Sequence, residues 1–349
     1  MITRRSFVAA APTLAAAHAI GHSGSEWATA APESLGLRAD VIADASTAGE
    51  SLPGLRALLV AHRGTLVCER YYGGSDADTL QPINSATKSV CSMLVGLALQ
   101  EGRLKSLDDT VAQLIPEAMA EVPDSAAGPV TLGQILSGQS GLAFDFAAFG
   151  QLAGAASTTR YALGRPGVPL SQPGWSYNDA MVSLIAPMLE RAQGSTLAAL
   201  AQRQLFEPLG IARFDWRRGR DGKPLAAAGL ALRTRDLLKL AALMLERGRW
   251  NGRQVLPESW VDASLNPRTR ATWGAGPVTD VGYGLLWFTG RIQGHRVAWA
   301  WGYGGQFALL APQQNLAVAT SATSPAPSAL RAQTDGIMAL VAKVLQAAP

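Results

Sequence analysis

Residues 84–90 read NSATKSV, and the apolar run CSMLVGLAL follows directly. Ser85 and Lys88 are three residues apart, so on a helix they lie on one face, about one turn from each other. The pattern from Ala86 to Glu101 is helical and apolar on nearly all sides, which predicts a buried helix ended by Gly102. A lysine at the head of such a helix needs a compensating partner, because burying an unpaired charge is costly.

Two interpretations of this serine and lysine are open. A serine near a helix start is usually only a cap. It can also be a nucleophile, because the free N–H groups and the dipole of a helix start favour the negative charge of an oxyanion. A lysine in an apolar pocket has its pKa lowered and can then accept or relay a proton. Only Lys88, of the five lysines in the chain, has a serine three residues before it.

Two further stretches contain candidate site residues. In PGWSYND (173–179), Tyr177 is a possible phenolate base if an ammonium lies nearby, although spacing alone favours a core tyrosine with Asp179 as a helix cap. In WGYGGQF (301–307), glycines lie beside a predicted strand. Such glycines mark either a bulge or a place where another group approaches the backbone closely, as a second oxyanion donor requires.

Composition argues against several classes of protein. The net charge of +4 is spread along the chain, and no lysine- and arginine-rich block is interleaved with aromatic residues, so we do not expect nucleic-acid binding. Beyond residue 31 the only histidines are His62 and His295, both in predicted solvated turns. There is no HExxH, P-loop, GxGxxG or GxSxG motif. Zinc, redox cofactors and a histidine base are therefore poorly supported.

The N-terminus has the pattern of a twin-arginine export signal. TRRSFV (3–8) places paired arginines before an apolar stretch, and AHA (17–19) offers a small-x-small cleavage site. About ten weakly apolar residues are too short to cross a bilayer core of about 30 Å. We therefore expect a signal peptide at 1–19, a linker at 20–31, and a mature protein in the periplasm or outside the cell without stable membrane insertion.

The remaining chain, 32–349, is predicted to form one α+β domain. Residues 55–72 are typical of a hairpin, and strands are expected again from about 281, in GYGLLWF, RVAWAW, FALLAP and LAVAT, before a closing helix at 329–347. A mainly helical region at about 103–255 separates them. This order predicts an antiparallel sheet built from both ends of the chain, flanked by helices. Cys68 falls in a predicted strand and Cys91 in a helix, which favours two separate buried thiols.

The chain resembles the serine-reactive β-lactamase and penicillin-binding-protein superfamily. The resemblance is greatest to its class C branch, which includes family VIII esterases, D-aminopeptidase-like enzymes and 6-aminohexanoate-dimer hydrolases. It covers nearly everything from Pro32 to Leu345. The segments that resemble the family, in family order, are LVCERYYGG, SATKSVCSMLVGLAL, LGQILSGQSGL, PGWSYND, GLALRTRDLLKLAALMLERGRWNGRQVLPESWV, YGLLWF and GYGGQFALLAPQQNLAVAT.

The resemblance implies a β-lactamase/transpeptidase-like fold and a role for each motif. Ser85 matches the acylated nucleophile, Lys88 its partner, and Tyr177 the tyrosine that helps deprotonate the serine and returns a proton to the leaving group. The third motif falls at Ala300-Trp301-Gly302, and the N–H of Tyr303 would complete the oxyanion site beside that of Ser85. The family mechanism uses neither a metal nor an organic cofactor.

Two departures from the family pattern matter. Asp179 stands where asparagine is usual, and an aspartate near Lys88 would hold the lysine protonated, which favours Tyr177 as the working base. Whether Asp179 faces Lys88 stays open at this point. The third motif also lacks its usual lysine or histidine, and Trp301 makes the site apolar instead.

The sequence therefore predicts an exported serine hydrolase that cleaves a carboxylic ester or amide through an acyl-enzyme on Ser85. Asp179, Trp301 and Gly302 are expected at the substrate site, and the substrate is a small ester or amide or a peptide-like molecule. One alternative is a class C-like β-lactamase or D-amino-acid peptidase, with an arginine elsewhere replacing the missing cation. Another is a catalytically silent penicillin-binding-like protein. The pocket is expected to be shaped by loops at about 143–172 and 266–282.

Overall fold

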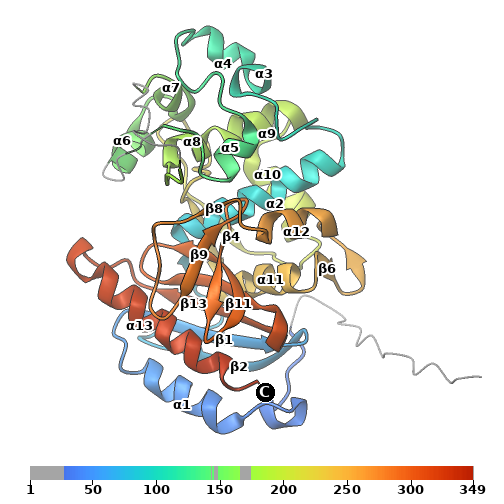
Figure 1. Ribbon diagram of the computed structural model, residues 1–349, viewed down its shortest axis with the longest axis vertical. Coiled ribbons are helices and arrows are strands. Elements are labelled where there is room, and N and C mark those ends of the chain that lie inside the picture. The colour runs from blue at the N-terminus through green and yellow to red at the C-terminus, as the bar shows by residue number, and fades with distance from the viewer. Residues whose placement is uncertain (1–26, 143, 145–147, 166–173, 349) are drawn as a thin grey trace, which may run out of the picture.

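The computed structural model describes residues 27–142, 144, 148–165 and 174–348 (Figure 1). The predicted signal peptide and most of the predicted linker lie outside these residues. The linker's last residues are ordered against the domain: Ala30 N donates to Leu66 O at 3.1 Å, and Leu66 N donates to Ala28 O at 2.8 Å. Trp27 is buried with its ring edge-on to Trp250, at 5.4 Å between centroids.

The centre of the fold is an eight-stranded antiparallel sheet with the order β2-β1-β13-β12-β11-β10-β9-β8. Its strands are β1 (Leu55–His62), β2 (Thr65–Tyr71), β8 (Thr269–Arg270), β9 (Thr279–Tyr283), β10 (Phe288–Ile292), β11 (His295–Gly302), β12 (Gln306–Ala311) and β13 (Leu316–Ala322). Because β1 pairs with β13 along its whole length, the N-terminal hairpin and the C-terminal strands form one sheet, as predicted.

Helices cover both faces of this sheet, which explains why its central strands β12 and β13 are buried throughout. The α1 helix (Ala39–Gly49) and the α13 helix (Pro327–Leu345) pack together on one face, and α11 (Thr234–Leu245) packs against β1, β12 and β13 (Figure 1). A short 3₁₀ turn, η1 (Pro32–Leu35), precedes α1. It ends at Gly36, which takes a left-handed conformation.

The middle of the chain forms the helical region at the top of Figure 1. Its helices are α3 (Val111–Leu114), α4 (Pro116–Ala120), α5 (Leu132–Leu136), α6 (Phe149–Gly154), α7 (Thr158–Leu163), α8 (Asp179–Ser183), α9 (Ile185–Gln193), α10 (Leu197–Ala201) and the π-helical turn η4 (Gln202–Phe206). Two small sheets, which the sequence did not predict, and α12 (Glu258–Leu265) connect this region to the main sheet. The small sheets contain β3 (Leu80–Pro82), β4 (Phe214–Trp216) and β5 (Leu230–Arg233), and β6 (Arg249–Trp250) and β7 (Arg253–Gln254).

The α2 helix (Thr87–Gln100) lies between the helical region and the main sheet. It is buried from Thr87 to Ala98, as its all-round apolar pattern predicted. Gly96 lets the Trp260 ring of α12 lie directly on the helix, since a Cβ at this glycine would be 2.4 Å from the indole. The helix that presents Ser85 and Lys88 is therefore held from several sides, which fixes its position relative to the sheet.

Two local predictions are wrong. The segment Gly284–Trp287 of the predicted strand GYGLLWF is the turn between β9 and β10, where Leu286 has φ 60° and Gly284 N donates to Trp287 O. His62 is not solvated: it is the last residue of β1 and is 4% exposed, and burial lowers its pKa. The prediction of two separate thiols is confirmed, since Cys68 and Cys91 are both buried and free.

Across the described ranges, we find no helix that combines the length and the apolar character required to cross a membrane.

Candidate active site

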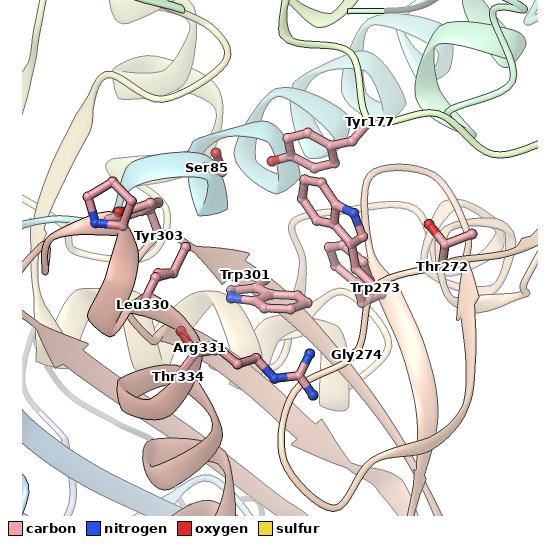
Figure 2. A pocket seen from close by; sticks show the side chains of 12 residues that line it. Ser85, Tyr177, Thr272, Trp273, Gly274, Trp301, Tyr303, Leu330, Arg331 and Thr334 are labelled. Carbon is pink, nitrogen blue, oxygen red and sulfur yellow. The ribbon is translucent and has the colours of Figure 1, made fainter. Parts of the chain in front are cut away.

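Ser85 lies in a tight turn that leads directly into α2. The turn is a 3₁₀ helix, η2 (Asn84–Ala86), and its first residue, Asn84, has φ 49°, a left-handed conformation that asparagine tolerates better than most residues. The Ser85 side chain lies at the wall of a cavity of about 430 Å³, with Tyr177 close by (Figure 2). The predicted serine at a helix start is thus also accessible to a small ligand.

Lys88 is buried one turn into the helix, and its charge has specific partners. Its Nζ lies 3.0 Å from Ser85 Oγ, 2.6 Å from the carbonyl oxygen of Ala227 and 2.7 Å from Asp179 Oδ1. Lys88 and Asp179 are 2% and 1% exposed. The compensating partner that a lysine in this helix requires is therefore Asp179, and the two side chains face each other. Two hydrogen-bond acceptors and one carboxylate around one nitrogen suit an ammonium group, because the ion pair with Asp179 compensates its charge.

Tyr177 joins the same cluster from the segment before α8. Its hydroxyl end points toward Ser85 (Figure 2), and Lys88 Nζ lies 4.6 Å from the centre of its ring. Burial and the negative charge of Asp179 raise the pKa of Tyr177 well above its usual value, against the smaller opposing effect of the nearby Ser85 hydroxyl. Tyr177 is therefore a neutral phenol in the free protein at neutral pH. The helix cap is Asn178, whose Oδ1 accepts from Met181 N at 3.0 Å, and not Asp179 as the simpler interpretation had it.

The third motif lies beside the turn that carries Ser85. At Gly302, the end of β11, a Cβ would be 2.1 Å from the carbonyl oxygen of Ile83, so only glycine allows this approach. Asn84 Nδ2 donates to the carbonyl oxygen of the next residue, Tyr303, at 2.9 Å and to Ser324 Oγ at 3.2 Å. The Asn84 side chain thus fixes the end of β11 relative to the turn that carries Ser85.

The cavity next to Ser85 is mainly apolar. Aromatic and aliphatic side chains from α13, β10, β11 and the segment after β8 surround it (Figure 2). The lining residues are Ser85, Tyr177, Thr272, Trp273, Gly274, Phe288, Trp301, Tyr303, Pro327, Leu330, Arg331 and Thr334. Arg331, on α13, is the one charged residue among them, so a cation reaches the cavity from a helix and not from the third motif.

The structure brings most of the predicted site residues together. Ser85, Tyr177, Trp301 and Tyr303 line the cavity, and Lys88 lies directly behind Ser85. The remaining two predicted residues do not line it: Asp179 is buried against Lys88, and Gly302 is packed on Ile83. Of the two loops expected to shape the pocket, the one at 266–282 contributes Thr272, Trp273 and Gly274. The described part of the other, residues 144 and 148–165, does not line the cavity.

Sequence reasoning missed the lining residues from α13 and β10, and also three contributors next to the proposed catalytic residues: the Asn84 side chain, the carbonyl of Ala227 and the Trp273 ring. Asn84 had a visible signal, because asparagine before a helix often takes a left-handed conformation. Trp273 had a weaker one, an aromatic residue in a loop rich in glycine. Ala227 had none, because any residue supplies a backbone carbonyl.

The sequence matches the model of the family described as Beta-lactamase over residues 41–343, which is most of the chain. The chain belongs to the Beta-lactamase family. Its fold is the β-lactamase/transpeptidase-like fold, so the resemblance inferred from the motifs is confirmed. The Beta-lactamase family is a family of β-lactamase-fold hydrolases.

Solved structures with this fold include proteins of different activities. A hydrolase with promiscuous acyltransferase activity, EstCE1, superposes with a TM-score of 0.71 at 15% identity, over 90% of this chain and 99% of that one. An octameric penicillin-binding protein homologue from Pyrococcus abyssi gives 0.66 at 19% identity, over 89% and 76%. A D-stereospecific amidohydrolase from Streptomyces gives 0.64 at 18% identity, over 80% and 93%.

At these identities the likeness to solved structures establishes the fold alone. A search of curated proteins finds no match to this sequence. The substrate of this Beta-lactamase family member therefore has to be argued from its own site.

Proposed function

We propose that the protein is an exported serine hydrolase that cleaves a carboxylic ester or amide through an acyl-enzyme on Ser85. The observation that carries the proposal is the position of Ser85 Oγ, at the wall of a 430 Å³ cavity and 3.0 Å from the Nζ of the buried Lys88. A cap serine needs neither a cavity nor a buried ammonium behind its hydroxyl. Both are what a nucleophile needs, since the ammonium stabilises negative charge on the attacking oxygen.

In the proposed acylation step, Ser85 Oγ attacks the substrate carbonyl carbon. The Ser85 proton passes to the Tyr177 oxygen as the Tyr177 proton passes to the leaving group, so the phenol ends the step neutral. This relay suits the raised pKa of Tyr177, because it needs no stable phenolate. The backbone N–H groups of Ser85 and Tyr303 are assigned to the carbonyl oxygen, which becomes the oxyanion.

Deacylation follows the same route in reverse. Water attacks the acyl carbon and gives its proton to Tyr177, which returns its own proton to Ser85 Oγ, and the acid is released. Asp179 holds Lys88 in place in both steps, since its Oδ1 lies 2.7 Å from Nζ and both side chains are buried. We therefore assign Asp179 to the support of Lys88 and not to direct contact with the substrate.

The lining of the cavity favours uncharged, apolar substrates. Ala300 stands where the family pattern has a cation at the third motif, Trp301 and Phe288 line the cavity with aromatic rings, and Leu330 closes the side toward α13. Arg331, whose Nε donates to Asp335, keeps the alternative of a class C-like β-lactamase or D-amino-acid peptidase open, because it places a cation at the far end of the cavity (Figure 2). The D-stereospecific amidohydrolase among the structural neighbours is consistent with this alternative. Export through a twin-arginine signal to the periplasm or the exterior is part of the proposal and rests on residues 1–19 alone.

The test is intact-protein mass spectrometry after treatment with a fluorophosphonate, with Ser85→Ala beside the wild type. We expect one adduct on the wild type and none on the variant. A panel with a short acyl ester, an anilide, a D-amino-acid amide and a chromogenic cephalosporin then separates the substrate classes. If the wild type stays unlabelled while a control serine hydrolase is labelled, Ser85 is only a helix-start residue and the silent binding protein becomes the better description.

A further inference from the structure

Trp273 is unusual in this molecule because it is an exposed aromatic residue in a cluster whose other rings are buried or partly buried. It is 41% exposed, and no other large apolar side chain among the described residues is classed as exposed. Its ring stacks on Tyr177, with 4.5 Å between centroids and 29° between planes, and it lies edge-on to Trp175 at 5.4 Å. Trp301 is edge-on to it at 6.4 Å, on the cavity side.

The segment that carries Trp273 is fixed to α13, far along the chain. Gly276 N donates to Asp335 Oδ1 at 2.7 Å, and the other carboxylate oxygen of Asp335 accepts from Arg331 Nε. Gly276 has φ 52°, and a Cβ there would be 2.9 Å from the carbonyl oxygen of Asp335, so the backbone lies directly on the helix. The loop from Ala271 to Val278 is therefore held at both sides of the cavity, on α13 through Gly276 and on Tyr177 through Trp273.

We propose that Trp273 is a specificity-determining residue, whose exposed ring binds a flat apolar leaving group such as a benzyl or aryl alcohol. This inference rests on the proposed function, since it assigns a substrate class to the same site. The position of Tyr177 determines which part of the substrate lies next to Trp273. The proposed relay delivers the proton to the leaving group from the Tyr177 oxygen, and Trp273 is the ring stacked on that tyrosine. A leaving group that accepts this proton lies beside the indole.

The physical basis is the burial of one ring on another. An aromatic ring pair contributes beyond its buried area when stacked or edge-to-face, and the edge of Trp301 offers a second contact to the same ligand. A small aliphatic leaving group makes neither contact. Discrimination of roughly 10-fold between an aromatic and a small leaving group is the scale that apolar pockets reach for such differences.

The experiment compares benzyl acetate with ethyl acetate in the wild type, Trp273→Ala and Trp273→Phe. Both substrates give the same acyl-enzyme, and both leaving alcohols have similar basicity. General damage to Tyr177 therefore cancels in the ratio of their kcat/KM values. We expect this ratio to fall about tenfold in Trp273→Ala and to be largely retained in Trp273→Phe. Trp250→Ala serves as the matched control, because Trp250 packs on Trp27 and is not among the cavity residues.

A second arm makes the inference independent of turnover. Binding of intact benzyl acetate to Ser85→Ala and to Ser85→Ala/Trp273→Ala is measured by saturation-transfer NMR. Loss of the signal in the double variant supports binding of the aromatic leaving group on Trp273 even if the wild type hydrolyses no ester. In that case only the proposed function fails. An active enzyme whose benzyl-to-ethyl ratio is unchanged in Trp273→Ala overturns the inference and leaves the proposed function standing. Equal NMR signals from both Ser85→Ala proteins overturn it too.

Discussion

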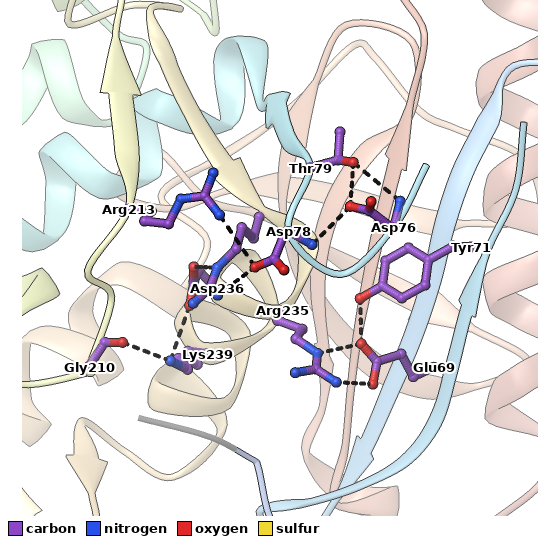
Figure 3. A network of polar contacts seen from close by, with 11 residues as sticks. Glu69, Tyr71, Asp76, Asp78, Thr79, Gly210, Arg213, Arg235, Asp236 and Lys239 are labelled. Carbon is purple, nitrogen blue, oxygen red and sulfur yellow. Dashed lines mark hydrogen bonds and ion pairs between the residues drawn. The ribbon is translucent and has the colours of Figure 1, made fainter. Parts of the chain in front are cut away.

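Among the described residues, two lysine–aspartate ion pairs have both side chains buried: Lys88–Asp179 and Lys239–Asp236. Their distances are similar, 2.7 Å and 3.1 Å between Nζ and Oδ1. Their surroundings differ. The Lys88 nitrogen also contacts the hydroxyl of Ser85 at the cavity wall, whereas Lys239 donates to the carbonyl oxygen of Gly210 at 3.2 Å, within a network of charged side chains (Figure 3).

The second pair also has a spare cation. Asp236 accepts from Arg233 through both oxygens, at 2.7 Å and 3.2 Å, so its charge stays compensated if Lys239 is lost. For Asp179, Lys88 is the cation within reach. Burial lowers the pKa of Lys239, which the charge of Asp236 opposes, and Lys239 is not among the residues that line the Ser85 cavity. A buried ion pair is therefore no sign of catalysis by itself; the serine and the cavity beside Lys88 make the difference.

The largest effect expected from this comparison is in Lys88→Met against Lys239→Met. We expect kcat/KM to fall by about 10³-fold or more in Lys88→Met, because the charge next to Ser85 Oγ is lost. Lys239→Met should keep near wild-type kcat/KM. The measurement is ester hydrolysis per folded protein, with circular dichroism to establish folding and Lys88→Arg as a variant that retains the charge.

The free energy of unfolding should also fall more in Lys88→Met than in Lys239→Met. Lys88→Met leaves Asp179 as a buried carboxylate without its cation, which costs about 3–5 kcal/mol in the free energy of unfolding. Lys239→Met leaves Asp236 with Arg233, so a smaller loss is expected. Denaturant unfolding of both variants decides this, and a larger loss in Lys239→Met would contradict the comparison.

Asp179→Asn restores the residue usual in the family and changes the site's charge with little change in shape. The negative charge of Asp179 raises the pKa of Tyr177, so its removal lowers that pKa. Activity that depends on the neutral phenol should therefore be lost at lower pH in the variant than in the wild type. The alkaline limb of kcat/KM, followed to above the ordinary tyrosine pKa of about 10, measures this shift. An unchanged or raised limb would show that Tyr177 is not the relay.

The two pairs also show what was accessible from sequence. Ser85, Lys88 and Tyr177 could be found because their motifs are local and because a lysine on an apolar helix demands a partner. Asp179 was named as a candidate partner because the family resemblance places it where the second motif usually has asparagine. The antiparallel sheet followed from hairpin and strand patterns at both ends of the chain, with the exception of the Gly284–Trp287 turn.

The rest depends on contacts between distant segments, which no local pattern reveals. The Ala271–Val278 loop owes its position to Asp335, about sixty residues later in the chain. Asn84 owes its role to Tyr303, more than two hundred residues away. His62 was expected in a solvated turn, but the adjoining strands bury it because β1 extends to that residue. Propensity describes such residues one at a time, and tertiary packing decides their environment.

Asn84 allows geometry to be separated from charge near Ser85. Asn84→Gly keeps the left-handed backbone and removes the hydrogen bonds to Tyr303 and Ser324. We expect kcat to fall about tenfold to a hundredfold with KM nearly unchanged, because the oxyanion donors lose their fixed spacing. Asn84→Ala should be less stable than Asn84→Gly by about 1 kcal/mol, since alanine is strained at φ 49°. Equal kcat values for Asn84→Gly and the wild type would remove Asn84 from the site.

The smallest effect expected is at Glu69, which extends the comparison to a pair that is only partly buried. Its carboxylate accepts from Arg235 of α11, with Nη2 to Oε2 at 2.7 Å, and this contact links the edge strand β2 to the helix (Figure 3). The carboxylate also accepts from the Tyr71 hydroxyl. Although burial opposes it, these hydrogen bonds lower the pKa of Glu69 overall. Because the folded pKa lies below the ordinary value of about 4.3, the stabilisation is present above that value and is lost as the pH falls through the folded pKa. Glu69→Gln should therefore cost about 1 kcal/mol at pH 7, and less at pH 3, with kcat/KM unchanged. Denaturant unfolding at the two pH values measures this, and a cost that grows on acidification would contradict the assignment.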